Sequence, residues 1–329
     1  MIRFSTPGRQ RLSQAMPGLM DVSFAGAEAT VAANFATFGG KARFLTALPK
    51  NELGEACEAS LKARGVDTSG ICWSEQGRLG TFFYESGAGP RPGKVIYDRA
   101  GSTFSSTPGS TYSWNSALED SDWLVVSGIT PAVSECAKGA ALQAIQHARA
   151  LGVKIALDIN FRSKLWNWKE GMEPHALASS ILPEFASLAN LLIGGPADVP
   201  LLTSGQSPGD AQEAFQVLAE SFPNLDLIAT SVRSDGTYGG AILETENGQF
   251  SHAKTYQPGE VVDRLGAGDA FLAALLYSLT TGESPSSAID FAAAAGCLAH
   301  SIKGDFSLLS NEEIRRFQTV GPSSQRVSR

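Results

Sequence analysis

The chain has 329 residues, of which 43% are hydrophobic and 18% are charged. This length and composition predict one large α/β domain with a substantial core, or such a domain with a small appendage. The formal net charge is −7 and the Lys and Arg residues are scattered, which argues against a nucleic-acid partner. No apolar run reaches membrane-spanning length and the first residues do not resemble a signal peptide, so no membrane partner is expected.

The four cysteines are far apart and include no Cys-x-x-Cys pair, and the four histidines are equally dispersed. This spacing suits a reducing compartment, so we expect a cytoplasmic protein without a disulfide framework or a zinc site. An anionic small molecule would have to be bound by individually placed arginines.

Small residues fill the stretch from Ala25 to Ala29 in the N-terminal third of the chain. At the junction of a loop and a helix, such residues let the backbone approach a ligand closely. Tight helix packing is an equally good explanation of the same pattern.

Residues 78–101 read as a β-hairpin, with strands over 81–84 and 94–99 around a Gly-rich loop. Alternation places Tyr97 and Arg99 on one face of the second strand. A hairpin inserted between a helix and a core strand is suited to act as a lid.

From about residue 120 onward, strand and helix patterns alternate. Apolar runs predict strands over 123–126, 154–158, 191–193 and 227–230, with a helix over about 134–151 after the first strand. This rhythm predicts a parallel sheet covered by helices on both faces. Ligands bind at the carboxyl ends of the strands in such sheets, and Asn160, Arg162, Ser231 and Arg233 follow strands.

The stretch 261–271 combines a short apolar strand, two glycines, an acid and the start of a helical pattern. Gly266 and Gly268 allow a tight turn whose N–H groups lie at the positive end of the following helix, which favours an anion. Asp269 then places a carboxylate beside that anion, where it could take a proton from a hydroxyl that attacks phosphorus. The simpler alternative is a strand-to-helix turn with Asp269 as a helix cap.

Ordered motifs along the chain resemble those of the ribokinase-like (PfkB) family of sugar kinases, and within it the 2-keto-3-deoxygluconate kinases. The motifs are Pro7-Gly8-Arg9-Gln10-Arg11-Leu12, Gly26-Ala27-Glu28, Tyr97-Asp98-Arg99-Ala100-Gly101-Ser102, Ser127-Gly128-Ile129-Thr130-Pro131, Leu157-Asp158-Ile159-Asn160-Phe161-Arg162, Asp263-Arg264-Leu265-Gly266-Ala267-Gly268-Asp269 and Gly304-Asp305-Phe306. Several separated matches in one order are far more specific than any single match.

The resemblance implies an α/β protein with a three-layer αβα ribokinase-like core and a small β-sheet lid. The implied lid segments are residues 1–24 and 77–107, the kinase core comprises 25–76 and 108–318, and 319–329 form a polar tail. The resemblance also implies a homodimer that forms through the lid, with ATP and Mg²⁺ as cofactors.

The implied activity is ATP-dependent phosphorylation of a primary hydroxyl of a ketodeoxy sugar acid such as 2-keto-3-deoxygluconate. Asp269 is the implied catalytic base, and the amides of Gly266, Ala267 and Gly268 form the anion hole. The resemblance places the following residues at the nucleotide or the sugar: Asn160, Ser231, Arg233 and Ala293 by the nucleotide, and Gly26, Ala27, Glu28, Tyr97, Arg99, Arg162 and Asp305 around the sugar. Arginine forks bind a sugar carboxylate with matching geometry.

Each of these single residues also has a structural explanation. Arg162 fits a surface position after a strand, Arg99 a solvated position in the lid, and Asp305 an acid in a turn. The small residues around Ala293 suit an adenine ring or close helix packing. Two further readings therefore stay open: a kinase for another ketose or a nucleoside, and a catalytically impaired protein that binds a sugar or nucleotide.

The chain departs from the family pattern in the substrate and metal regions. Relatives usually carry one more core strand ahead of Pro7, and its absence would remove backbone pairing from the sheet or leave the sheet repaired by another segment. Ala25 and Thr30 stand where a glycine and an asparagine are usual, and Phe82 stands where a tyrosine is common. The Asn-x-x-Glu motif associated with Mg²⁺ is reduced to the acid Asp198, a weak candidate for handling the metal.

Overall fold

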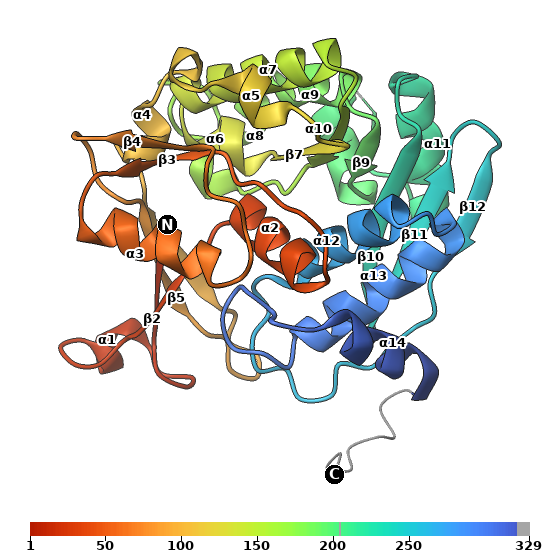
Figure 1. The fold of residues 1–329 in the computed structure, drawn as a ribbon. Coiled ribbons are helices and arrows are strands. Elements are labelled where there is room, and N and C mark those ends of the chain that lie inside the picture. The colour runs from red at the N-terminus through yellow and green to blue at the C-terminus, as the bar shows by residue number, and fades with distance from the viewer. Residues whose placement is uncertain (204, 321–329) are drawn as a thin grey trace.

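A six-stranded sheet forms the centre of the fold in the computed structural model, which describes residues 1–203 and 205–320 (Figure 1). Its strand order is β12 (Gln249–His252), β11 (Thr237–Glu244), β10 (Leu227–Ser234), β9 (Leu191–Ile193), β8 (Lys154–Asp158) and β7 (Trp123–Ser127). Strands β7 to β10 run parallel, as the sequence predicts. The antiparallel strands β11 and β12 extend the sheet at the other end.

Helices cover both faces of this sheet, which confirms the three-layer αβα arrangement. One face carries α7 (Glu135–Ala150), α8 (Pro174–Ser179), α9 (Leu182–Ser187), α10 (Val199–Leu202) and α11 (Ala211–Ser221). The other face carries α2 (Ala27–Thr37), α12 (Ala267–Thr280), α13 (Pro285–Ala299) and α14 (Asn311–Val320). Each layer has its own large hydrophobic cluster against the sheet.

Local chemistry explains why the elements begin and end where they do. Strand β8 is apolar on both faces, with Ile155, Ala156 and Leu157 fully buried, as expected for a parallel strand between two helical layers. The hydroxyl of Ser134 accepts the N–H of Ala137 and so caps α7. Gly152, whose φ is +76°, turns the chain after that helix.

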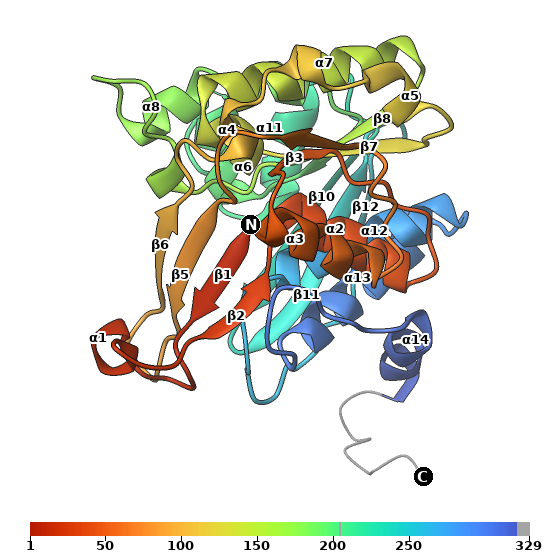
Figure 2. The same cartoon turned by 60° about the vertical axis from the view of Figure 1, so that its left-hand side comes forward.

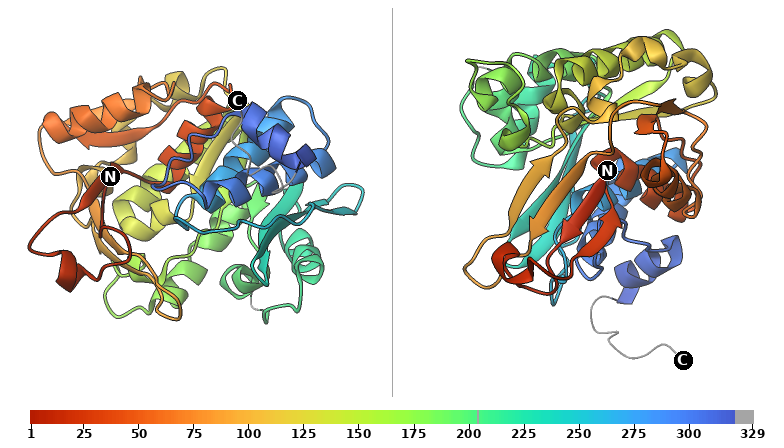
Figure 3. Two further views of the ribbon diagram at one scale, coloured as in Figure 1. Left: turned by 90° about the horizontal axis from the view of Figure 1, so that it is seen from below. Right: turned by 90° about the vertical axis from the view of Figure 1, so that its left-hand side faces the viewer.

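A second sheet of four strands forms the lid. Its order is β2 (Asp21–Phe24), β1 (Ile2–Ser5), β5 (Thr81–Glu85) and β6 (Lys94–Asp98). Figure 2 and Figure 3 show this sheet as a separate slab beside the core. All four strands fall within the predicted lid segments 1–24 and 77–107. Short helices complete the connections: α1 (Leu12–Ala15), α4 (Thr103–Ser106), α5 (Trp114–Leu118) and α6 (Ile129–Val133).

Two strands near the N-terminus stay outside the central sheet. Strands β3 (Thr46–Pro49) and β4 (Ile71–Ser74), which flank α3 (Glu52–Lys62), pair only with each other among the described residues. They form a two-stranded sheet of their own. A cavity of about 960 Å³ separates β3 from β7.

The C-terminal helix α14 continues to Val320, two residues beyond the predicted end of the kinase core at residue 318. The rest of the predicted tail, residues 321–329, lies outside the described residues. Among the described residues, no helix is both long and apolar enough to cross a membrane.

Candidate active site

The turn before α12 has the geometry of an anion site. Gly266 has a φ of +82°, and a methyl group there would lie 2.3 Å from the carbonyl oxygen of Asp305, so only glycine fits. At Gly268 an added methyl group would meet no atom within 4 Å, which leaves open space beside the backbone. Gly268 is the second residue of the 14-residue helix α12, so this space lies at the N-terminal end of that helix. The turn can therefore receive an anion such as a phosphate group.

Asp269 lies in the first turn of α12, next to that open space. Burial raises the pKa of its carboxyl group well above the usual value, and the nearby carboxylates of Asp158 and Asp305 raise it further. The positive charge of the Arg162 guanidinium lowers this pKa in part. A carboxylate with a raised pKa is a stronger base than an exposed aspartate, which suits proton abstraction from a hydroxyl.

Strand β8 brings a second acid to the same region. Burial raises the pKa of Asp158 to about 7, while the charge of Arg162 lowers it. Asn160 follows with a φ of +37° and donates its amide N–H to Asp158 Oδ2 at 3.1 Å. The amide oxygen of Asn160 is buried and has no hydrogen-bond partner among the described residues. A buried oxygen without a donor is suited to a cation or to a ligand hydroxyl.

Asp198 lies close enough to Asp158 for its charge to raise the pKa of that residue, and its role at the metal stays a prediction. Its carboxylate accepts the backbone N–H of Gly195 at 2.8 Å and so caps its own short helical turn, Pro196–Asp198. Burial raises its pKa. In the described part of the chain, no group of three or more His, Cys, Asp or Glu side chains is arranged to hold a metal ion. The oxygens of Asp158 and Asn160 do suit Mg²⁺ in the form in which one or two protein ligands and substrate phosphates share the ion.

Arg99 is a half-buried cation that belongs to the lid. Arg99 follows β6 and is desolvated, which lowers its pKa, while the charge of Glu28 raises it. Neither Arg99 nor Arg162 has a carboxylate within ion-pair distance in the described ranges. The positive charges of both guanidinium groups lower the pKa of the Tyr97 hydroxyl, against the larger effect of burial. The three predicted sugar residues therefore lie close enough to interact electrostatically. Two arginines without a carboxylate partner near one tyrosine hydroxyl favour a negatively charged ligand.

Glu28 lies at the start of α2, after the N-cap Gly26 and Ala27. Its carboxylate accepts the N–H of Ser127 at 3.2 Å and the hydroxyl of Thr130 at 2.6 Å. These bonds attach the start of α2 to the carboxyl end of β7. Glu28 is therefore held in place by protein groups.

A buried ion cluster was missed by the sequence reasoning. Arg3 of β1 is only 2% exposed and lies 2.5 Å from Asp263 and 3.4 Å from Asp305. Its guanidinium also lies 4.8 Å from the centre of the Tyr84 ring. The charge of Arg3 lowers the pKa of Asp305, but burial outweighs it and raises that pKa to about 6. Nothing local in the sequence indicated the partners of Arg3, which lie 260 and 302 residues away.

The predicted nucleotide residues fall into two groups. Ser231 and Arg233 lie on β10, and Arg233 is 5.4 Å from the ring centre of Tyr238. The hydroxyl of Tyr238 in turn donates to the carbonyl of Ala267 at 3.4 Å, next to the anion turn. Ala293 is fully buried in α13, so the close-packing explanation is satisfied at that position and its contact with adenine stays a prediction.

The departures from the family pattern lie around the sugar residues. Thr30 is fully buried, and its hydroxyl has no hydrogen-bond partner among the described residues. Phe82 is buried opposite Tyr97 in the lid, with 6.2 Å between the ring centres. The large cavity beside β7 reaches Gly26, Glu28 and Arg99 but is lined by neither Asp269 nor Arg162. It is therefore distinct from the catalytic turn.

Comparison with known proteins agrees with this geometry. Residues 17–310 match the model of the pfkB family carbohydrate kinases. A 2-dehydro-3-deoxygalactonokinase of Haloferax volcanii is 30% identical over 316 residues, which cover 96% of this chain and 93% of that protein. A 2-dehydro-3-deoxygluconokinase of Bacillus subtilis is 26% identical over an alignment that covers 90% of this chain and 88% of that protein.

Solved structures show the same relationship. The crystal structure of a 2-dehydro-3-deoxygluconokinase from Thermotoga maritima superposes with a TM-score of 0.88 at 32% sequence identity. The superposition covers 97% of this chain and 96% of that one. With the fold, the family match and a relative of 30% identity in agreement, the chain belongs to the pfkB family of carbohydrate kinases.

Proposed function

We propose that this carbohydrate kinase transfers the terminal phosphoryl group of ATP to a primary hydroxyl of a ketodeoxy sugar acid, such as 2-keto-3-deoxygluconate. The observation that carries the substrate class is the pair of arginines without a carboxylate partner, Arg99 from the lid and Arg162 after β8, whose charges both act on the hydroxyl of Tyr97. A neutral ketose would leave both charges without a partner. The relatives named for 2-dehydro-3-deoxy sugar acids support the same class.

Asp269 accepts the proton of the attacking hydroxyl in this proposal. The sugar oxygen forms a bond to the terminal phosphorus while the bond from that phosphorus to the bridging oxygen of ADP breaks. The amides of Gly266, Ala267 and Gly268 stabilise the charge on the phosphoryl oxygens, since they border open space at the start of α12. Mg²⁺ would neutralise phosphate charge when bound, and Asp158 and Asn160 are the residues suited to hold it.

A homodimer that forms through the lid is part of the proposal. The outer face of the lid sheet carries an in-register row of Val22, Phe4, Phe83 and Ile96, one residue from each strand. The rings of Phe4 and Phe83 stack at 5.2 Å, while Val22 and Ile96 are 62% and 53% exposed. A continuous apolar row on a sheet face suits contact with a second copy. The cytoplasmic location is likewise proposed, supported by four cysteines that form no disulfide.

The proposal is tested with a substrate panel in a coupled assay of ADP release with ATP and Mg²⁺. We expect 2-keto-3-deoxygluconate or its galactonate epimer to give a kcat/KM about a hundredfold above that of a neutral ketose, because a charge-assisted contact pair is lost with the carboxylate. A nucleoside or neutral ketose as the preferred substrate would instead support a different kinase specificity. Sugar binding in calorimetry with no ADP release at any Mg²⁺ concentration would show a binding protein without catalysis.

A further inference from the structure

Arg3 lies on an inner strand of the lid sheet and faces the kinase core. Its strand, β1, pairs with β2 on one side and with β5 on the other. In the register of the sheet, Arg3 stands in one row with Phe82 and Tyr97, on the face opposite the exposed row that contains Val22 and Ile96. The lid backbone therefore fixes the position of Arg3 from both sides.

All three nitrogens of the Arg3 guanidinium have a partner. Nε donates to the hydroxyl of Ser5 at 2.7 Å, Nη1 lies 3.4 Å from Asp305 Oδ2, and Nη2 lies 2.5 Å from Asp263 Oδ2. The ring of Tyr84 covers one face of the group. A guanidinium bound in this way cannot turn without breaking several contacts, so it holds both acids in place.

Asp263 connects this cation to the anion turn, residues 266–268. Its Oδ1 accepts the N–H of Leu265, the residue directly before the turn, at 3.1 Å. Its Oδ2, which pairs with the guanidinium, also accepts the N–H of Gly304 at 3.2 Å. The carboxylate therefore joins the beginning of the anion turn both to the lid and to the loop of residues 300–306, called here the 300–306 loop.

Asp305 limits the anion turn from the other side. Its carbonyl oxygen lies so close to Gly266 that an added methyl group there would be 2.3 Å from it. Its carboxylate is held by Arg3 through Oδ2. One cation of the lid thus fixes the two residues that determine where the anion turn begins and how closely the 300–306 loop approaches it.

A second ion pair joins the lid to the 300–306 loop, but it is exposed. Lys303 Nζ lies 2.5 Å from Oδ2 of Asp21 in β2, and the two side chains are 55% and 44% exposed. In the part of the chain that the structure describes, neither side chain bonds to the anion turn. Exposed pairs of this kind contribute little to stability. Lys303 is therefore a matched control for Arg3.

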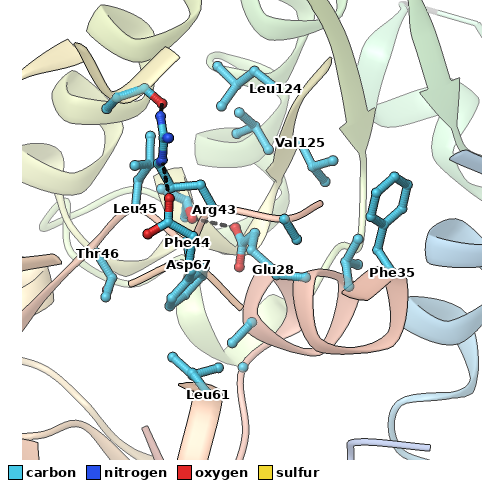
Figure 4. Close-up of a pocket in the computed structure, with 18 of the residues that line it drawn as sticks. Glu28, Phe35, Arg43, Phe44, Leu45, Thr46, Leu61, Asp67, Leu124 and Val125 are labelled. Carbon is cyan, nitrogen blue, oxygen red and sulfur yellow. Dashed lines mark hydrogen bonds and ion pairs between the residues drawn. The ribbon is translucent and has the colours of Figure 1, made fainter. Parts of the chain in front are cut away.

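We propose that Arg3 is a positioning residue for phosphoryl transfer, which acts from the lid through Asp263 and Asp305 to give the anion turn the shape that receives the transferring phosphoryl group. The anion turn is then complete only while the lid is in this position. The inference rests on the proposed function, because it assigns Arg3 to the same reaction. It is independent of the cavity between β3 and β7 (Figure 4), which none of these three residues lines.

The test uses three variants of the full chain. Arg3→Met removes the charge and keeps an unbranched side chain, whereas Arg3→Lys keeps the charge but loses the fork that reaches both acids. Lys303→Met removes the exposed pair with the same loop. ADP release measures turnover, and calorimetry measures the affinity for ADP with and without aluminium fluoride, a mimic of the transferring phosphoryl group. Urea unfolding identifies conditions in which every variant is folded.

We expect Arg3→Met to lower kcat by about thirtyfold or more and to change the KM for ATP by less than about threefold, because displaced anion-hole donors weaken binding of the transition state. Its affinity for ADP should fall only when aluminium fluoride is present. Arg3→Lys should show an intermediate loss. Guanidinium ion at a low concentration should restore part of the turnover of Arg3→Met alone, since it fits between the two acids. Lys303→Met should stay within about twofold of the parent chain.

A folded Arg3→Met with the kcat of the parent chain, or an equal loss in Lys303→Met, would overturn the proposal. A loss of ADP affinity that is the same with and without aluminium fluoride would show that Arg3 has only a structural role. If the parent chain phosphorylates no sugar of the panel, the proposed function fails, and the aluminium fluoride complex still decides whether Arg3 shapes the turn. A parent chain that does not bind this complex would overturn the inference as well.

Discussion

Asp269 is the proposed catalytic base, and its environment predicts how the activity depends on pH. Burial and the neighbouring acids Asp158 and Asp305 raise the pKa of its carboxyl group. Because a base must be deprotonated to act, activity should rise as the pH rises through this elevated pKa. In a plot of kcat against pH, the acidic limb is therefore expected at a pH well above the pKa of an exposed aspartate.

Replacement of Asp269 by Asn removes the base while keeping the shape of the side chain. We expect kcat to fall by about a thousandfold, with a small change in KM, since positioning by the turn and the arginines remains. The control is Asp226→Asn, which changes an exposed acid paired with Lys154 on the surface. Full activity of Asp269→Asn in the ADP-release assay would remove Asp269 from the mechanism.

Arg3 connects the lid to the catalytic turn. Its guanidinium bridges Asp263 and Asp305, and Asp263 also accepts the N–H groups of Leu265 and Gly304. Three segments that are distant in the sequence therefore meet at one buried cation. Without that cation, two buried carboxylates would face each other.

Arg3→Met should lower the free energy of unfolding by about 3 kcal/mol at pH 8, because it leaves buried charges unpaired. The loss should be smaller at pH 5. Arg3 lowers the pKa of Asp305, so its removal raises that pKa above about 6, and at pH 5 the carboxyl group is protonated and uncharged. Urea unfolding at the two pH values measures both effects.

The control for this change is Arg78→Met, which breaks an exposed lid ion pair with Asp98. It should cost less than about 1 kcal/mol at either pH. An equal loss of stability by Arg3→Met at pH 5 and pH 8 would contradict the electrostatic role of Arg3.

At the scale of elements, the turn before helix α12 contains one glycine that the fold requires and one that the proposed function requires. Its two glycines differ in environment. Gly266 has a positive φ and is crowded by the carbonyl of Asp305, whereas Gly268 borders open space. The first glycine is therefore required by the fold and the second by the expected phosphate.

Gly266→Ala should destabilise the protein by about 1–3 kcal/mol, because alanine strains the backbone and its methyl group collides with Asp305. Gly268→Ala should leave the unfolding free energy nearly unchanged but lower kcat by about a hundredfold, since its methyl group occupies the place of the phosphoryl oxygens. Urea unfolding and turnover, measured on both variants, separate the two effects. A fully active Gly268→Ala would argue against phosphate binding at this turn.

The elements that the sequence predicted well have local signals. The predicted strand 154–158 matches β8, and the predicted helix 134–151 matches α7 to within one residue at each end. Ser134 and Gly152 mark the ends of α7 by their own chemistry. Strand β10 was predicted only to residue 230 but continues to Ser234, because its exposed end pairs with β11.

At the scale of the whole molecule, the apolar row on the lid predicts how two copies associate. Ile96→Lys places a charge at the exposed end of that row and should weaken the dimer by about tenfold or more. Leu53→Lys is the matched control, since Leu53 on α3 is also 53% exposed but lies outside the row. Sedimentation at several concentrations measures the association. A monomeric parent chain, or equal effects of the two variants, would contradict assembly through the lid.

The sequence by itself determined the α/β class, the parallel strands β7 to β10 in outline, and the turn that places Asp269 at a helix N-terminus. These features depend on hydrophobic periodicity, glycine and capping residues, which act over a few positions. Only the tertiary structure decided that Arg3 forms ion pairs with Asp263 and Asp305, that Asp198 caps its own turn, and that a cavity separates β3 from β7. Those outcomes depend on which distant segments are buried against each other, and no local pattern carries that information.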